Sequence, residues 1–191
     1  MKIKNICVFC SSSDDIDVDF FKTANELGKL IAKNNINIIH GAGKIGLMGE
    51  IEKGARNYDT KVIGIIPQKL YKRGIYSETL DDIIITKDMK KRKEIMREKS
   101  DAFIILPGGF GTLEEAIETI TLKQLKYHTK PIVFLNTKNF YSDLFSQFNK
   151  FYNNKFTNPK FKDLYFIAET PLQAIDYILN YKYNEIVDKW L

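Results

Sequence analysis

The chain of 191 residues is 44% hydrophobic and 28% charged, with a net charge of +5, which is typical of a soluble globular protein. No apolar run approaches the ~20 residues that a membrane span needs. No signal peptide precedes the first predicted strand, so we expect a cytoplasmic protein without a membrane partner. The length fits one domain over residues 1–191 with a substantial core.

Predicted strands and helices alternate along the whole chain. Strands are expected at residues 4–10, 37–40, 61–66, 83–85, 101–106, 131–135 and 164–167. Helices are expected at residues 17–34, 47–58, 89–99, 112–126 and 140–152, and a last helix begins at Pro171. A looser, more polar segment spans residues 68–80. This alternation predicts a single-domain, doubly wound (Rossmann-like) α/β fold, a parallel sheet with helices on both faces.

The two cysteines, Cys7 and Cys10, form a C-x-x-C within the first predicted strand. Strand positions i and i+3 point to opposite faces, so these two thiols cannot pair or share a metal ion. We expect Cys7 in the core and Cys10 at the end of the strand. His40 and His128 have no metal-ligand neighbour at a suitable spacing, so no metal site is expected.

Glycine- or serine-rich turns follow the first, second and fifth predicted strands, at residues 11–13, 41–46 and 107–112. In the second turn, Gly41, Gly43 and Gly46 spell G-x-G-x-x-G, the dinucleotide fingerprint. That fingerprint also needs an acidic residue at the end of the next strand, where this chain has Pro67 and Gln68. We therefore expect the turn to approach a nucleotide smaller than NAD or FAD.

The third turn reads L-P-G-G-F-G-T-L-E-E. It joins an apolar run, with the composition of a buried parallel strand, to a predicted helix. Gly108, Gly109 and Gly111 allow a tight turn, and Thr112 is a good helix N-cap. A glycine turn at a helix N-terminus forms an anion site, most often for phosphate. The alternative is a purely structural T-x-x-E capping box between Thr112 and Glu115, and both interpretations can hold together.

Two charged features accompany this turn. Glu114 and Glu115 lie one turn into the predicted helix, and an acid beside a phosphate cradle indicates chemistry on a phosphorylated small molecule. Residues 90–93, Lys-Lys-Arg-Lys, form the only dense basic run. Taken alone, this run is best explained as a solvated helix face. The other basic residues are scattered, so we expect no nucleic-acid partner despite a pI near 9.0.

Several motifs together resemble the LOG ("lonely guy") family of cytokinin riboside 5′-monophosphate phosphoribohydrolases, long mislabelled as lysine decarboxylases. They follow the family order over nearly the whole chain: V-F-C-S-S at 8–12, G-A-G-K-I-G-L-M-G at 41–49, I-I-P at 65–67, S-E-T at 77–79, M-K-K-R-K at 89–93, P-G-G-F-G-T-L-E-E at 107–115, Q-L at 124–125 and K-P at 130–131. Ser11, Ala42 and Lys90 depart from the usual Gly, Gly and His of the family, and each adds a side chain near the expected pocket.

The resemblance implies hydrolysis of the N-glycosidic bond of a purine riboside 5′-monophosphate or AMP, giving free base and ribose 5-phosphate without a redox cofactor or metal. It implies a catalytic pair at Arg92 and Glu115. Glu115 would stabilise an oxocarbenium-like ribosyl cation and orient or deprotonate water, and Arg92 would balance charge on the leaving purine or hold phosphate or ribose. The substrate-binding residues expected from the resemblance are Cys10, Ser11, Gly41, Gly43, Gly46, Met48, Glu78, Lys93, Gly108, Gly109, Phe110, Gly111, Thr112 and Glu114.

A homodimer is expected by resemblance and from the 13 Phe and 10 Tyr residues. Apolar residues on more than one face of the helix after the glycine turn indicate burial against the sheet and against a second subunit. Two rival functions stay open. A non-catalytic nucleotide-binding or sensing protein would dock an anionic ligand or RNA on residues 89–99. A pyridoxal-phosphate lysine decarboxylase would need a Schiff-base lysine and a pyridine partner, for which no motif is present.

Overall fold

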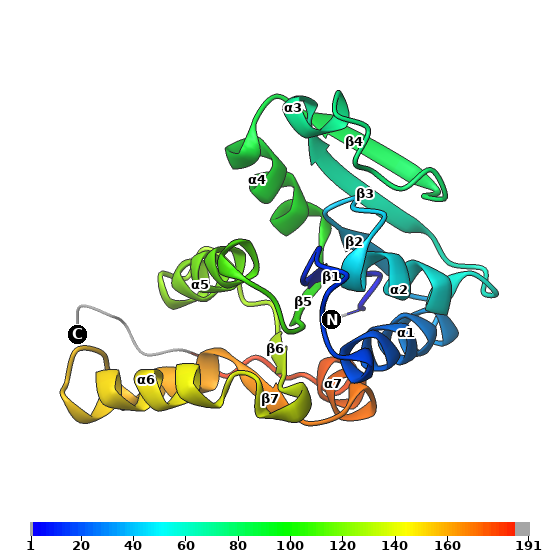
Figure 1. The fold of residues 1–191 in the computed structure, drawn as a ribbon. Coiled ribbons are helices and arrows are strands. Elements are labelled where there is room, and N and C mark those ends of the chain that lie inside the picture. The colour runs from blue at the N-terminus through cyan, green and yellow to red at the C-terminus, as the bar shows by residue number, and fades with distance from the viewer. Residues whose placement is uncertain (1, 186–191) are drawn as a thin grey trace.

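The computed structural model describes residues 2–185 and contains a seven-stranded sheet in the order β4-β3-β2-β1-β5-β6-β7 (Figure 1). Every neighbouring pair of strands is parallel, which confirms the predicted doubly wound sheet. The strands are β1 Asn5–Phe9, β2 Asn37–His40, β3 Val62–Pro67, β4 Asp82–Thr86, β5 Ala102–Ile105, β6 Ile132–Leu135 and β7 Phe166–Ala168.

Helices cover both faces of this sheet (Figure 1). They are α1 Val18–Lys33, α2 Gly46–Ala55, α3 Gln68–Tyr71, α4 Met89–Lys99, α5 Phe110–Gln124, α6 Ser142–Asn153 and α7 Pro171–Leu179, with 3-10 turns η1 Thr137–Asn139 and η2 Pro159–Leu164. α1, α2 and α7 pack on one face, and α4, α5 and α6 pack on the other. Among residues 2–185, no helix is long and apolar enough to cross a lipid bilayer.

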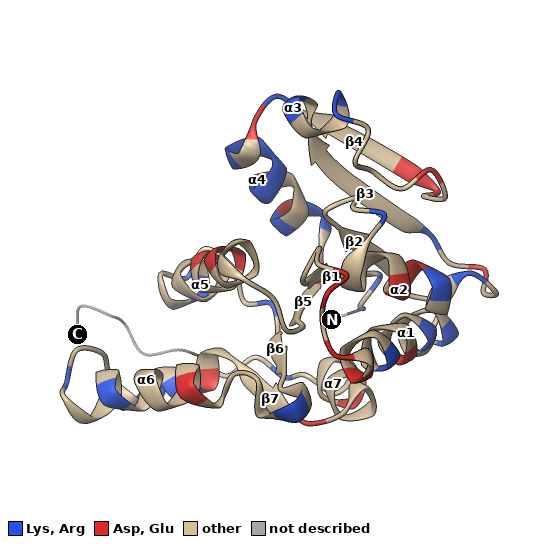
Figure 2. Cartoon of the chain, viewed as in Figure 1, with Lys and Arg blue, Asp and Glu red and all other residues tan. Residues whose placement is uncertain are grey.

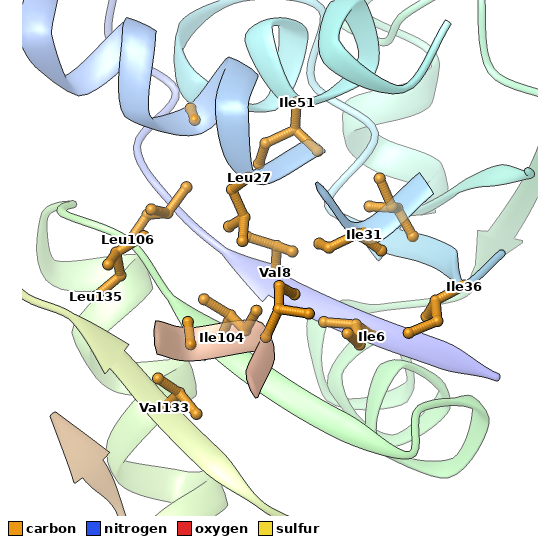
Figure 3. Packing of buried hydrophobic residues seen from close by; sticks show 14 of the residues in the cluster. Ile6, Val8, Leu27, Ile31, Ile36, Ile51, Ile104, Leu106, Val133 and Leu135 are labelled. Carbon is orange, nitrogen blue, oxygen red and sulfur yellow. The ribbon is translucent and has the colours of Figure 1, made fainter. Parts of the chain in front are cut away.

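The alternation of side chains along β1 divides the core into two layers. Ile6 and Val8 point toward α1 and α2, where they meet Leu27 in the cluster drawn in Figure 3. Cys7 and Phe9 point to the opposite layer, against α4 and α5. The same alternation confirms the prediction for the cysteines, because Cys7 is buried in the core while the free thiol of Cys10 lies at the end of the strand.

The order of the strands places a topological switch between β1 and β5. The chain builds β2, β3 and β4 outward on one side of β1, and then returns to place β5 on the other side. Ligand sites of doubly wound sheets lie at the carboxyl ends of strands beside such a switch. Here those ends carry the serine turn that follows β1 and the glycine turn that follows β5.

Three local expectations from the sequence differ from the structure. Thr112 is not the N-cap of α5, because the extended backbone of Gly109 lets the helix begin at Phe110, two residues earlier. The alternative of a capping box between Thr112 and Glu115 is not realised either, since the N-cap is Gly109, which has no side chain to bond, and the Glu115 carboxylate accepts from Arg92. The segment 68–80, predicted to be loose, contains the short helix α3 and the buried side chain of Ser77.

Candidate active site

A cavity of about 630 Å³ opens at the carboxyl ends of the strands around the topological switch. The residues predicted for the site that line it are Cys10, Ser11, Gly41, Gly43, Met48, Arg92, Gly109, Gly111, Thr112, Glu114 and Glu115. Gly46, Glu78, Lys93, Gly108 and Phe110 were also predicted for the site, but they are not among its lining residues. The structure thus brings together residues from five separate motifs of the sequence.

The N-terminus of α5 opens on this cavity. The first N–H groups of a helix have no partner within the helix and carry part of its positive dipole. Gly109, Gly111 and Thr112 line the cavity at this end, and the space beside the Cα atoms of both glycines is open. Gly108 packs so closely against Thr112 that a Cβ on Gly108 would overlap the Thr112 side chain. Gly108 therefore shapes the turn without lining the cavity. The arrangement suits a phosphate group.

The serine turn after β1 forms the wall beside the α5 terminus. The Ser11 N–H donates to Pro107 O at 3.2 Å, which joins this turn to the glycine turn. Gly46, in the left-handed region with φ of 66°, packs on the backbone of the serine turn, and its N–H donates to Asp14 Oδ1 at 2.7 Å. Gly46 therefore supports the wall rather than lining the cavity, and Asp14 is a support that sequence reasoning missed.

The buried ion pair between Arg92 of α4 and Glu115 of α5 forms the polar centre of the cavity. Arg92 Nη1 donates to Glu115 Oε1 at 2.6 Å, and Arg92 Nε donates to Ile65 O at 3.0 Å. Only 12% and 11% of the two side chains are exposed. Burial raises the pKa of Glu115 above its usual value of 4.5, although the charge of Arg92 opposes this shift. The guanidinium also lies against Gly41, where a Cβ would overlap it.

A ladder of ion pairs continues outward from this pair between α4 and α5. Figure 2 shows the basic segments of α4 in blue and the acidic segments of α5 in red. Lys93 pairs with Glu114 at the cavity rim and lies 3.2 Å from a carboxylate oxygen of Glu118. Arg97, one turn further along α4, pairs with Glu118 at 2.6 Å. The basic run of α4 is therefore not simply a solvated face, because the residues turned toward α5 meet its acidic residues.

The remaining wall of the cavity is apolar. It is contributed by Ile45, Met48, Ile66, Leu70, Ile75, Met89 and Met96. Sequence reasoning identified only Met48 among them, because isolated apolar residues in turns and short helices resemble ordinary core residues. The one available signal was the position of Leu70 and Ile75 in a segment otherwise too polar to form core.

This fold and this cavity define a class of protein: a doubly wound α/β domain with a site for a phosphorylated organic molecule that has an apolar part. The family model described as "Possible lysine decarboxylase" matches residues 48–178. A cytokinin riboside 5′-monophosphate phosphoribohydrolase of Arabidopsis thaliana is 40% identical over 180 residues, which cover 94% of this chain and 84% of the relative. A probable enzyme of the same name from Oryza sativa subsp. japonica is 37% identical over 190 residues, 98% of this chain and 76% of the relative. The chain belongs to the LOG family of phosphoribohydrolases, as its motifs predicted.

Solved structures agree on the fold. The molybdenum cofactor binding protein of the phototrophic bacterium Rippkaea orientalis superposes with a TM-score of 0.71 and is 28% identical, with 94% of this chain and 97% of that chain covered. The molybdenum cofactor carrier protein of Chlamydomonas reinhardtii, at 23% identity and a TM-score of 0.70, shares the fold. Proteins with this architecture thus carry different ligands, so the ligand has to be inferred from the side chains of the site.

Proposed function

We propose that the chain hydrolyses the N-glycosidic bond of a purine (cytokinin) riboside 5′-monophosphate, releasing free base and ribose 5-phosphate. The single observation that carries this proposal is the buried Arg92–Glu115 pair, which lines the same cavity as the N-terminus of α5. A carboxylate and a phosphate-binding helix end are the groups that cleavage of a nucleoside monophosphate requires. Membership of the LOG family supports the same reaction.

The chemistry of the walls orients the proposed substrate. Its 5′-phosphate binds the N–H groups at Gly109–Thr112 and the adjacent serine turn. The ribose then lies beside Glu115, and the purine lies toward Arg92 and Met48. An isoprenoid group on N6 of the purine packs on the apolar wall that contains Leu70, Ile75 and Met89. This wall supports a prenylated nucleotide as a better substrate than plain AMP.

In the proposed reaction, the bond between C1′ of ribose and N9 of the purine breaks, and its electron pair leaves with the base. Positive charge develops on the ribose as this bond lengthens, and the Glu115 carboxylate stabilises it. Water attacks C1′ and gives a proton to Glu115. Arg92 balances the negative charge that develops on the purine until the base takes up a proton.

The proposed function is tested by incubating the purified chain with AMP, N6-prenylated AMP, GMP and adenosine, followed by chromatography for free base. We expect base release from the adenine monophosphates, faster from the prenylated one, and none from adenosine because it lacks the phosphate. Saturable binding of AMP without release of adenine would instead identify a nucleotide sensor. Intact nucleotides and no binding would contradict both functions.

A first prediction from the buried site concerns the loss of activity at acidic pH. Glu115 acts as an anion, and burial raises its pKa above 4.5, so activity is lost as the pH falls through this raised pKa. We expect kcat/KM to decline at a pH higher than an ordinary glutamate would give. Initial rates measured between about pH 4 and pH 8 test this. An activity that stays constant down to the ordinary glutamate range would show that the anion of Glu115 is not required.

We further propose that the active protein is a homodimer formed over the outer faces of α5 and α6. Ile117 of α5 lies partly exposed on this side, next to Phe151 and the largely exposed Phe156. A hollow of about 240 Å³ lies between the two helices, bordered by Ile117 and both of these phenylalanines. α5 also carries Glu115, so dimer formation supports the active site through the same helix.

The dimer is a second prediction, tested by sedimentation of the full chain at assay concentration. We expect a dimer, and we expect Phe156→Asp to shift it toward monomer and to lower activity because a charge replaces an apolar contact. Leu172→Asp is the matched control, because it makes the same change of charge at an exposed apolar position of α7, on the opposite face of the sheet, and is expected to leave the dimer intact. A fully active monomer would refute the proposal.

A further inference from the structure

A network of buried polar side chains lies behind the cavity and is not part of its lining. His40 ends β2, Glu52 belongs to α2, and Ser77 and Thr79 precede β4. His40 is 0% exposed and Glu52 is 6% exposed. Burying a charged group is costly unless the protein satisfies its hydrogen bonds, so such a cluster needs a structural or functional reason.

The hydrogen bonds of His40 fix the orientation of its ring. Nδ1 accepts the backbone N–H of Ala42 at 3.1 Å, so the ring proton is on Nε2. Nε2 lies 3.4 Å from Glu52 Oε1, which is close enough for an electrostatic contact, and neither atom has a hydrogen-bond partner within residues 2–185. The imidazole therefore connects the loop after β2 to the carboxylate on α2.

Glu52 connects the same loop to the segment that precedes β4. Its Oε2 accepts the hydroxyls of Ser77 at 2.7 Å and Thr79 at 2.8 Å. Burial opposes ionisation, but the adjacent His40 and the hydrogen bonds from Ser77 and Thr79 outweigh it and hold the pKa of Glu52 below its usual value. The Ser77 N–H in turn donates to Ala42 O at 2.8 Å. Both peptide groups of Ala42 are thus held, one by His40 and one by Ser77.

Ala42 requires this support because its backbone lies in the left-handed region, with φ of 66°, which costs a non-glycine residue about 1 kcal/mol. Its neighbours Gly41 and Gly43 line the cavity, and Gly41 is the surface on which the Arg92 guanidinium rests. A shift of the loop would therefore move the wall that positions Arg92. Ile75, on the other side of the network, belongs to the apolar wall.

We propose that His40 and Glu52 are positioning residues for the reaction: through Ala42 they hold the loop 41–43 that places Arg92 against the substrate. This inference rests on the proposed hydrolase function. His40 and Glu52 do not touch the substrate, and they act by fixing the backbone behind the cavity. Because phosphate binding is supplied by α5, on the other side of the cavity, the network acts mainly on kcat and little on KM.

Two amide substitutions of His40 separate its hydrogen bond with Ala42 from its contact with Glu52. In His40→Asn, the side-chain oxygen lies where Nδ1 was and can accept the Ala42 N–H, while the contact with Glu52 is lost. In His40→Gln, the longer side chain reaches Glu52 and leaves the Ala42 N–H without its acceptor. Each variant removes one contact of the same buried residue, so the two serve as matched controls for stability.

The experiment measures kcat and KM with the best nucleotide substrate, together with thermal unfolding of each full-length variant. We expect His40→Asn to stay within about threefold of the wild-type kcat and His40→Gln to fall about twentyfold, both with KM within about twofold. Equal kcat losses in the two variants would overturn the proposal, as would a loss confined to KM. A wild-type chain that releases no base would instead overturn the proposed function itself.

A milder variant keeps the test decisive if the His40 variants do not fold. Glu52→Gln retains the size of the side chain and removes the charge that His40, Ser77 and Thr79 face. We expect kcat about fivefold lower and KM within about twofold. A folded Glu52→Gln protein with wild-type kcat would show that the network is structural only.

Discussion

Glu115→Gln is expected to lower kcat about a hundredfold or more, equivalent to about 2.7 kcal/mol of transition-state stabilisation. The substitution keeps the shape of the side chain and an oxygen that can accept the hydrogen bond from Arg92 Nη1, but it removes the negative charge. In the proposed reaction, that charge stabilises a ribosyl cation and accepts a proton from water. Binding of AMP should survive, because the N–H groups at the start of α5 contact the phosphate. Single-turnover release of adenine and equilibrium binding of AMP measure the two effects separately.

Glu118→Gln is the matched control for this substitution. Glu118 lies one turn further along α5 and also pairs with basic residues of α4, but it does not line the cavity. We expect nearly unchanged kcat in this variant, since it loses an ion pair of the same ladder without touching the reaction. If Glu115→Gln releases base at a near-normal rate, Glu115 is not the group that stabilises the cation, whatever its position in the family motif.

The hydrogen-bond partner of the Glu115 carboxylate could not be predicted from the sequence. Its spacing from Thr112 fits a capping box, and local spacing is the only geometry that a sequence displays. The structure brings Arg92, 23 positions earlier in the chain, to within 2.6 Å of its carboxylate. This long-range pair competes with the local cap and excludes it. The start of α5 was missed for a related reason, because the extended backbone of Gly109 determines it rather than the chemistry of Thr112.

The fold was predictable because each of its signals is local. Apolar runs, helical apolar faces and turns of glycine, serine and proline alternate, and a parallel sheet then has few alternative arrangements. The same argument located the site at the carboxyl ends of the strands. It also assigned the glycine pattern 41–46 to a nucleotide, and Gly41 and Gly43 do line the cavity.

Features formed by residues distant in sequence could not be predicted in this way. Lys123 is 1% exposed, with its Nζ donating to Leu164 O at 2.9 Å, yet nothing in the sequence distinguishes it from the surface lysines. His40 and Glu52 look like isolated polar residues at the end of a strand and in a helix. Their roles depend on which side chains the crossovers bring alongside them, and a single sequence contains no direct record of those contacts.

Arg92→Lys is expected to lower kcat about thirtyfold or more, equivalent to about 2 kcal/mol. The planar guanidinium donates in two directions, through Nε to Ile65 O and through Nη1 to Glu115. A lysine keeps the charge, but its single ammonium group on a flexible stem cannot hold both partners in the same geometry. The loss should therefore appear even though the charge of the site is unchanged. Steady-state kinetics with the prenylated monophosphate and with AMP measure it.

The matched control is Arg97→Lys, because Arg97 pairs with Glu118 on the same two helices but does not line the cavity. Its kcat should stay close to that of the wild type. The double variant Arg92→Lys with Glu115→Gln should lose less than the product of the two single losses, since each residue orients the other through the bond at 2.6 Å. Strictly multiplicative losses would mean that Arg92 and Glu115 act independently. If the Arg92→Lys enzyme has normal turnover, only the positive charge at this position matters. The two hydrogen bonds of the guanidinium, to Ile65 O and to Glu115, would then have no part in the reaction.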